Sequence, residues 1–205
     1  MLTRSPSPGL AGLSLDPDQA LAEALDWQSR EGKGQVVWIT GLSGVGKTAL
    51  AAGIHLRLRA LGAPVAWLDG DALRRHFGAA GIHLEQTERL QLAVRYASFA
   101  ADLARAGAWV LVSTISLFHC IHEFNRTLAR NHDFRYREIW LRADELVRQQ
   151  RAADRFGGPR VGHDQPAQLP LAPDLILNND DSPATLCDLV DCVIRSLEGQ
   201  ADVPF

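Results

Sequence analysis

A glycine-rich stretch in the first quarter of the chain carries the strongest sign of chemistry. It matches the pattern GxxxxGK[ST], follows the apolar run VVWIT and opens the helical stretch TALAAGIHLRLRAL. In such a loop backbone N–H groups and the helix N-terminus attract phosphate, Lys47 reaches the β- and γ-oxygens, and the Thr48 hydroxyl can ligate Mg²⁺. We therefore predict an ATP or GTP phosphate site with Lys47 as a catalytic group, formed by Gly41, Leu42, Ser43, Gly44, Val45, Gly46, Lys47 and Thr48. The alternative is a glycine loop without a ligand.

Two carboxylates, Asp69 and Asp71, follow the next short apolar run. The carboxyl edge of a parallel sheet is where such folds bind ligands, so these acids are expected beside the glycine loop. We choose Asp71 as the catalytic carboxylate, which orients an acceptor hydroxyl, takes its proton or joins Thr48 in holding Mg²⁺. Arg74 lies one helical turn further on and can face the same cleft to bind an anionic acceptor. The alternatives are that Asp71 only caps a helix beginning at Ala72 and that Arg74 is a solvated surface residue.

The elements that must position these loops alternate short apolar runs with longer amphipathic ones. This alternation predicts strands joined by crossover helices around a parallel sheet. The expected strands are 36–40, 65–68, 109–114, 136–141 and 175–177, and the expected helices are 47–61, 72–78, 86–106, 119–131, 143–155 and 183–198. The predicted fold class is α/β, a P-loop NTPase-type three-layer sandwich with a five-stranded parallel sheet. We expect one domain over residues 34–205, preceded by a flexible segment and a peripheral helix within residues 1–33.

Composition narrows the class of protein further. The chain has 205 residues, of which 46% are hydrophobic, and 21 Lys+Arg against 24 Asp+Glu give a formal net charge of −3. A net negative charge produces no overall positive field that would attract nucleic acid or an anionic membrane. The most apolar stretch is too short and too interrupted by polar residues to span a bilayer. The odd cysteine set, Cys120, Cys187 and Cys192, lacks CxxC spacing and argues against disulfides and a zinc cluster. We expect a cytoplasmic protein with no nucleic-acid or membrane partner.

Five segments taken in order resemble the adenylylsulfate kinase family. They are GLSGVGKT, LDGDALR, TERLQLAVR, VLVSTIS and VGHDQPAQLPLAPDLIL. The resemblance implies a cytoplasmic enzyme of sulfate assimilation that uses Mg²⁺ and moves the γ-phosphate of ATP to the 3′-hydroxyl of adenylylsulfate. It places Asp71 near Mg²⁺ and the acceptor, and it assigns Arg74, Arg89, Ile115 and Ser116 to acceptor binding. Homodimers are common in the family, so a homodimer is a further expectation.

Two positions depart from the family pattern on the acceptor side. Ala72 and Leu92 replace family asparagines, which removes two amides that would face the acceptor. The segment ISLFHCIHEFNR looks like a subgroup whose acceptor is another nucleotide, such as a cytidine diphosphoramidate. In that subgroup His119, His122 and Arg126 would line the acceptor pocket, and the alternative for them is a solvated helical face. A metal site at His119, His122 and Glu123 is disfavoured, because their spacing matches neither HExxH nor HxxEH.

The segment that resembles the family's lid is reduced and has no lysine. Arg151 fits the lid arginine of the family, and Arg155 or Arg160 can supply the missing cation, although arginine and lysine are not equivalent at a phosphate. A short lid that closes poorly would favour ATP hydrolysis or low activity. A non-catalytic nucleotide-binding or regulatory protein is therefore the remaining alternative.

Overall fold

The structure is a computed structural model, and it describes residues 34–77, 85–116, 118–153, 167–180 and 183–198. The predicted helix within residues 1–33 lies outside these ranges. Five strands form one sheet: β1 (Gln35–Thr40), β2 (Val65–Asp69), β3 (Trp109–Ser113), β4 (Arg135–Arg142) and β5 (Leu175–Asn178). Every pairing is parallel, in the order β2-β3-β1-β4-β5. The predicted five-stranded parallel sheet is therefore confirmed, with strand ends within one residue of those expected from sequence.

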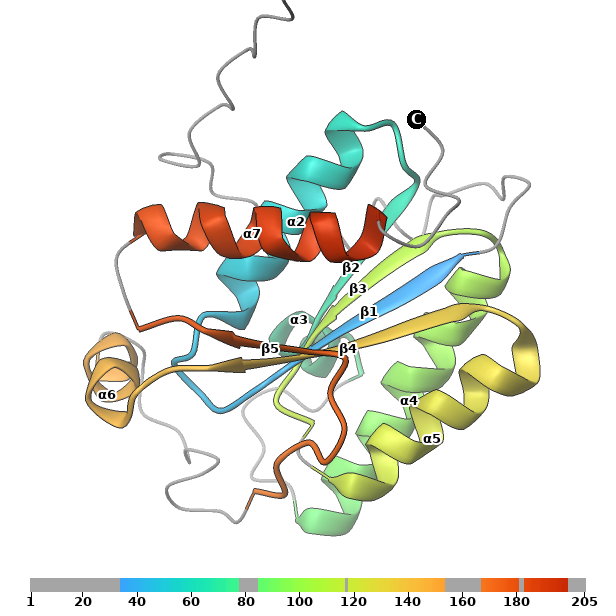
Figure 1. The fold of residues 1–205 in the computed structure, drawn as a ribbon. Coiled ribbons are helices and arrows are strands. Elements are labelled where there is room, and N and C mark those ends of the chain that lie inside the picture. Colours follow the sequence, from blue (N-terminus) through green and yellow to red (C-terminus); the bar gives the residue numbers. More distant parts are fainter. Residues whose placement is uncertain (1–33, 78–84, 117, 154–166, 181–182, 199–205) are drawn as a thin grey trace, which may run out of the picture.

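Helices cover both faces of this sheet (Figure 1). The helices α2 (Lys47–Ala60) and α7 (Pro183–Glu198) lie on one face, and α4 (Gln86–Arg105) and α5 (His119–His132) lie on the other. The short α3 (Gly70–His76) follows β2, and α6 (Glu145–Ala153) follows β4. This arrangement is the predicted three-layer sandwich. Among the described residues, no helix is both long and apolar enough to cross a membrane.

Each face of the sheet carries its own hydrophobic core because successive strand residues point to opposite sides. On β1, Val37 and Ile39 pack toward α2 and α7, whereas Val36 and Trp38 pack toward α4 and α5. The strands β1, β2 and β3 are largely apolar on both faces, as a sheet covered by helices requires. This buried sheet holds the loops at the carboxyl ends of β1, β2 and β3 in fixed positions.

The ends of two helices show why the chain turns where it does. A capping box begins α4, where Glu85 and Glu88 exchange side-chain and backbone hydrogen bonds. Asp69 caps α3, and its Oδ1 accepts the N–H groups of Asp71 and Ala72 at 3.0 and 3.4 Å. The helix therefore begins at Gly70, two residues before the predicted start, and the cap is Asp69 rather than Asp71.

Candidate active site

The glycine loop, residues 41–48, joins β1 to α2 and packs against two later parts of the chain. Gly44 and Gly46 have φ angles of 82° and 95°, which favour glycine. A Cβ at Gly44 would lie 2.6 Å from the carbonyl oxygen of Arg148 in α6, and one at Gly46 would lie 2.5 Å from Nδ2 of Asn179. Glycine at these two positions therefore allows both the turn and the close approach of α6 and the end of β5.

Positive charge gathers inside the glycine loop. Lys47 Nζ donates to the carbonyl oxygens of Gly41 and Leu42 at 2.9 and 2.8 Å, so the ammonium lies against the loop backbone. The first turn of α2 contains no acidic residue, which leaves the positive end of the helix dipole uncompensated there. The loop offers an anion a lysine, backbone N–H groups and a helix N-terminus together, as the sequence predicted.

Asp69 joins the glycine loop to the neighbouring strands. Its Oδ2 accepts the hydroxyls of Thr48 and Ser113 at 3.0 and 2.9 Å, and its side chain is almost fully buried. Trp67 Nε1 in turn donates to Ser113 Oγ at 3.0 Å. The sequence prediction paired Thr48 with Asp71 at a metal, whereas the structure places Asp69 directly against Thr48. The signal that identifies Asp69 is its position as the last strand residue and helix cap.

A cleft of about 380 Å³ opens beside these groups. Its lining joins the glycine loop to the ends of β2 and β3 and to α6 and α7. The lining residues are Ser43, Gly44, Gly46, Lys47, Thr48, Ala49, Asp69, Gly70, Asp71, Arg74, Ser113, Thr114, Ile115, Arg151, Asn179 and Leu186. The two predicted loops therefore share one cleft, and the acidic loop contributes both Asp71 and Arg74 to it.

A second guanidinium group, Arg89 on α4, lies near Arg74 but outside the lining of the cleft. Arg74 forms an ion pair with Asp71 within α3. The guanidinium of Arg89 lies 5.4 Å from the ring centre of Phe118. Burial and the nearby charge of Arg74 lower the pKa of Arg89. The guanidinium groups of Arg74 and Arg89 therefore lie near each other, and this concentration of positive charge favours binding of an anion beside them.

Asn179, which no sequence pattern marked, fastens the end of β5 to the glycine loop. Its Nδ2 donates to the carbonyl oxygen of Val45 at 2.8 Å, and its own carbonyl accepts Arg151 Nη1 at 2.7 Å. Arg151, the predicted lid arginine, therefore lines the cleft from α6. The other two lid candidates, Arg155 and Arg160, lie outside the described residues.

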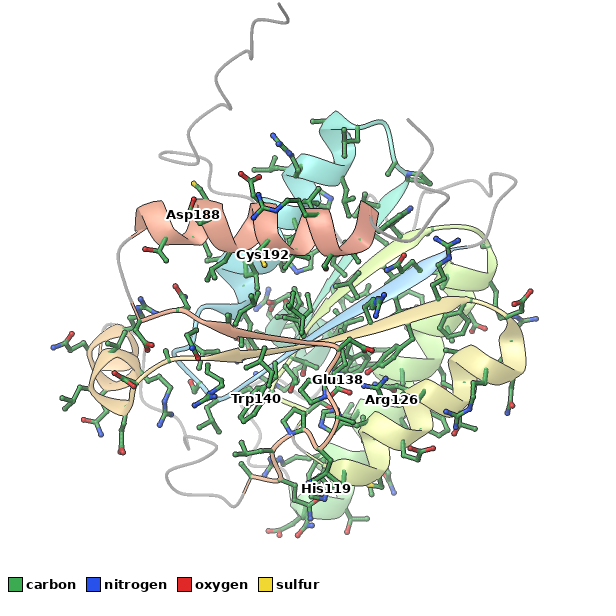
Figure 2. The ribbon with its side chains drawn as sticks, in the orientation of Figure 1. His119, Arg126, Glu138, Trp140, Asp188 and Cys192 are labelled. Atoms are coloured by element: carbon green, nitrogen blue, oxygen red, sulfur yellow. The ribbon has the colours of Figure 1, made fainter. Side chains whose placement is uncertain are left out.

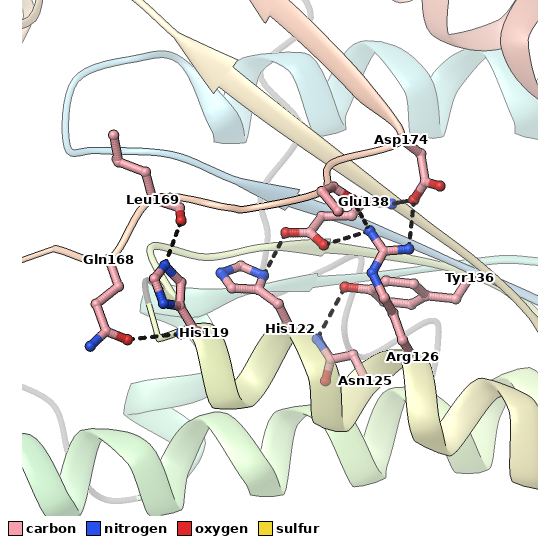
Figure 3. Close-up of polar contacts among 10 residues, drawn as sticks. His119, His122, Asn125, Arg126, Tyr136, Glu138, Gln168, Leu169 and Asp174 are labelled. Atoms are coloured by element: carbon pink, nitrogen blue, oxygen red, sulfur yellow. Dashed lines mark hydrogen bonds and ion pairs between the residues drawn. The ribbon is translucent and has the colours of Figure 1, made fainter.

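His122 and Arg126 take part in a polar network between α5 and β4 rather than lining the cleft (Figures 2 and 3). Glu138, on β4 and 1% exposed, lies 2.5 Å from His122 Nδ1 and accepts Arg126 Nη2 at 2.9 Å. Arg126 also contacts the carbonyl of Ala172 and the carboxylate of Asp174. The network fixes residues 167–174, which lead into β5, against α5.

His119 also contacts this segment and does not line the cleft. Its backbone N–H donates to Gln168 Oε1, and its Nε2 lies 2.9 Å from the Leu169 carbonyl oxygen (Figure 3). Of the other predicted acceptor residues, Ile115 lines the cleft, whereas Arg89 and Ser116 do not. The Ser116 hydroxyl is buried with no hydrogen-bond partner among the described residues. Acceptor roles for Arg89, Ser116 and His119 stay predictions.

Comparisons with known proteins agree on one family. A family model described as adenylylsulphate kinase matches residues 33–157. An adenylyl-sulfate kinase of Synechococcus sp. strain JA-3-3Ab is 33% identical over 173 residues, which cover 80% of this chain and 94% of that protein. A cytidine diphosphoramidate kinase of Campylobacter jejuni is 31% identical over 170 residues, which cover 79% of this chain and 95% of that protein.

A solved structure extends this likeness to the fold. The Mycobacterium tuberculosis APS kinase in complex with AMPPNP and APS matches with a TM-score of 0.71 at 28% identity. The match covers 81% of this chain and 98% of that one. This likeness confirms the predicted P-loop NTPase-type fold.

Proposed function

The chain belongs to the adenylylsulphate kinase family and is a kinase-type phosphotransferase, and we propose that it transfers the γ-phosphate of ATP to the 3′-hydroxyl of adenylylsulfate. The observation that carries this proposal is the shared cleft. The glycine loop lines it on the side expected for the donor, and Asp71 and Arg74 line it on the side expected for the acceptor. A donor phosphate and an acceptor hydroxyl bound in one cleft are close enough for direct transfer.

Binding of the ATP phosphates relies on positive charges that the folded protein already holds in place. Lys47 and the N-terminus of α2 offset the negative charge of the β- and γ-phosphates. Thr48 and Asp69 provide hard oxygen atoms beside them, which fits Mg²⁺ held partly through water and phosphate oxygens. When bound, Mg²⁺ would neutralise charge that develops on the phosphate oxygens.

The acceptor end relies on Asp71. The oxygens of Asp69 already accept two hydroxyls and two backbone N–H groups, so that carboxylate is engaged in holding the site together. Asp71 is more exposed and lines the cleft, where it can orient an acceptor hydroxyl and take its proton during transfer. Arg74, with Arg89 beside it, would hold an anionic group of the acceptor.

A second candidate acceptor, a cytidine diphosphoramidate, is supported by one relative, and Leu92 marks a departure from the adenylylsulfate kinase pattern. Leu92, where the family resemblance expects an amide, is 8% exposed and belongs to the core under α4. It offers no hydrogen bond to an acceptor base. The Campylobacter jejuni relative, named for that cytidine substrate, matches most of the chain.

Mass spectrometry of reactions with ATP and Mg²⁺ separates these acceptors. A panel of adenylylsulfate, AMP, CMP and cytidine diphosphoramidate is incubated with the wild type and with Lys47→Ala. A phosphorylated product from adenylylsulfate supports the proposal. A product only from a cytidine nucleotide would show that the acceptor is a cytidine nucleotide and that the phosphoryl transfer itself is as proposed. No product from any acceptor, with ATP still bound, favours the non-catalytic alternative. Light scattering on the same preparation tests the expected homodimer.

A further inference from the structure

The two carboxylates of the acidic loop differ in what already holds them. Asp69 is buried, and both of its oxygens accept hydrogen bonds from the surrounding protein. Asp71 has a 63% exposed side chain, which forms an ion pair with Arg74. The carboxylate suited to take a proton, Asp71, is therefore paired with a cation.

Arg74 can pair either with Asp71 or with an anionic group of the acceptor. It lies one helical turn after Asp71, with its side chain 37% exposed, and both residues line the cleft. Its charge also acts on two groups of α4, since it lowers the pKa of Arg89 and counters the rise in the pKa of Tyr96. An anion entering this region would meet two guanidinium groups, and Arg74 would gain a more strongly charged partner than a half-exposed carboxylate.

We propose that Arg74 exchanges partners during the reaction: it pairs with Asp71 before the acceptor binds and moves to the anionic group of the acceptor, which releases Asp71 for the acceptor hydroxyl. This inference rests on the proposed function and adds regulation to it. Before the acceptor arrives, the ion pair keeps the Asp71 oxygens from orienting water toward ATP. Arg74 is thus both an acceptor-binding residue and a brake on wasteful hydrolysis.

The chemistry balances in both settings. With acceptor bound, its hydroxyl oxygen forms a bond to the γ-phosphorus, the bond from that phosphorus to the β–γ bridging oxygen breaks, ADP leaves and the hydroxyl proton passes to Asp71. With the brake removed and no acceptor, water takes the place of the hydroxyl, and the products are ADP and inorganic phosphate. Because the ion pair is half-exposed, the brake should be worth about two- to fivefold in rate.

The test measures ADP release from ATP and Mg²⁺ without any acceptor. Arg74→Gln should raise this release about two- to fivefold over the wild type. The double variant Asp71→Asn with Arg74→Gln should lose the increase, because no carboxylate is left to free. Arg74→Lys should raise KM for the acceptor, because a lysine ammonium does not replace the planar, two-pronged guanidinium at an anionic group. Circular dichroism and melting curves confirm that each variant is folded.

One control separates release of Asp71 from a general loss of positive charge. Arg105→Gln removes the matching i,i+3 partner of Asp102 on α4, an exposed pair at 3.5 Å, and should leave ADP release unchanged. The proposal is overturned if Arg74→Gln releases ADP no faster than the wild type, or if Arg105→Gln or the double variant shows the same rise. Because this assay contains only ATP, it gives its answer even if every proposed acceptor fails.

Discussion

Thr48 donates its side-chain hydroxyl to Asp69 Oδ2 across 3.0 Å, and this bond joins the loop after β1 to the end of β2. The same carboxylate caps α3, the helix that carries Asp71 and Arg74. A displacement of the glycine loop would therefore also shift the acidic loop, because the buried side chain of Asp69 bonds to both.

Lys47→Ala should lower phosphoryl transfer by about 10²–10³-fold, because one preorganised charge at the transferred phosphate is lost. The fold should persist, since Lys47 contacts loop carbonyls rather than the core. Steady-state ADP release with acceptor measures the effect. Arg57→Ala, on the same helix in an exposed pair with Asp191, is the control and should keep wild-type turnover. Wild-type turnover by folded Lys47→Ala would contradict the donor assignment.

Asp71→Asn should lower kcat by about 10²–10⁴-fold and leave ATP affinity nearly unchanged, because the amide cannot take the acceptor proton. Its melting temperature should match the wild type, since Asp69 and not Asp71 caps α3. Turnover, ATP titration and calorimetry measure the three quantities. A lower melting temperature with normal turnover per folded molecule would show that Asp71 is structural instead.

Asp69→Asn should raise the Mg²⁺ concentration needed for half-maximal activity, because the charge beside Thr48 is lost. The amide oxygen can still cap α3, but the amide nitrogen cannot accept the hydroxyls of Thr48 and Ser113, so the melting temperature should also fall. Activity is titrated with Mg²⁺ at saturating ATP, with Asp71→Asn as the comparison. If Asp71→Asn shifts the Mg²⁺ requirement and Asp69→Asn does not, the original pairing of Thr48 with Asp71 is restored.

Glu138→Ala should lower the free energy of unfolding by about 3 kcal/mol, because it breaks a buried ion pair and leaves Arg126 and His122 without their shared carboxylate. Urea denaturation measures the loss. Glu123→Ala is the matched control, since Glu123 pairs with Arg130 on the surface of α5 and its loss should cost less than about 1 kcal/mol. Equal costs for the two variants would mean that the network does not secure residues 167–174.

The two tyrosines of the chain should resist ionisation until the protein unfolds. Burial raises the pKa of Tyr96 to about 12, and burial together with Glu138 raises the pKa of Tyr136 well above its usual value. Between pH 10 and 12 the unfolded chain has therefore lost a phenol proton that the folded protein keeps. Stability is full below pH 10 and falls as the pH rises, by roughly 2–3 kcal/mol for Tyr96.

Ultraviolet absorbance at 295 nm follows this titration directly. Native protein should show no phenol ionising near pH 10, whereas protein in urea should show both. In Tyr96→Phe the alkaline loss of stability should shrink, because one of the two shifted groups is gone. A native tyrosine that titrates near pH 10 would contradict the burial described for these rings.

Much of the sheet could be predicted because β1, β2 and β3 are largely apolar on both faces, and because β1 and β2 end at loops with recognisable chemistry. Residues 36–40 and 109–114 were expected as strands and lie in β1 and β3, with ends shifted by one residue. The start of α3 was harder. Both Asp69 and Asp71 are good capping residues, and sequence alone does not show which side chain turns back toward the N–H groups.

The glycine loop could be predicted from the local spacing of its residues, but the distant residues that hold it in place could not. Asn179 lies far along the chain from Val45, and an asparagine after a short strand has no distinctive pattern. His122 lies next to Glu123 and one helical turn before Arg126, so a solvated face was a reasonable alternative. Its burial depends on Glu138, which comes from the middle of a strand and was not marked as a partner.

The strand order also determines when, during synthesis, the chain can complete the sheet that supports nucleotide binding. β1 lies at the centre of the sheet, and both of its neighbours, β3 and β4, come from the second half of the chain. The glycine loop therefore leaves the ribosome long before the strands that fix it, and pairings so distant in sequence form slowly. Nucleotide binding would then report the completion of the sheet, and a nascent chain that stops before β4 would leave one edge of β1 open to chaperones or to other chains.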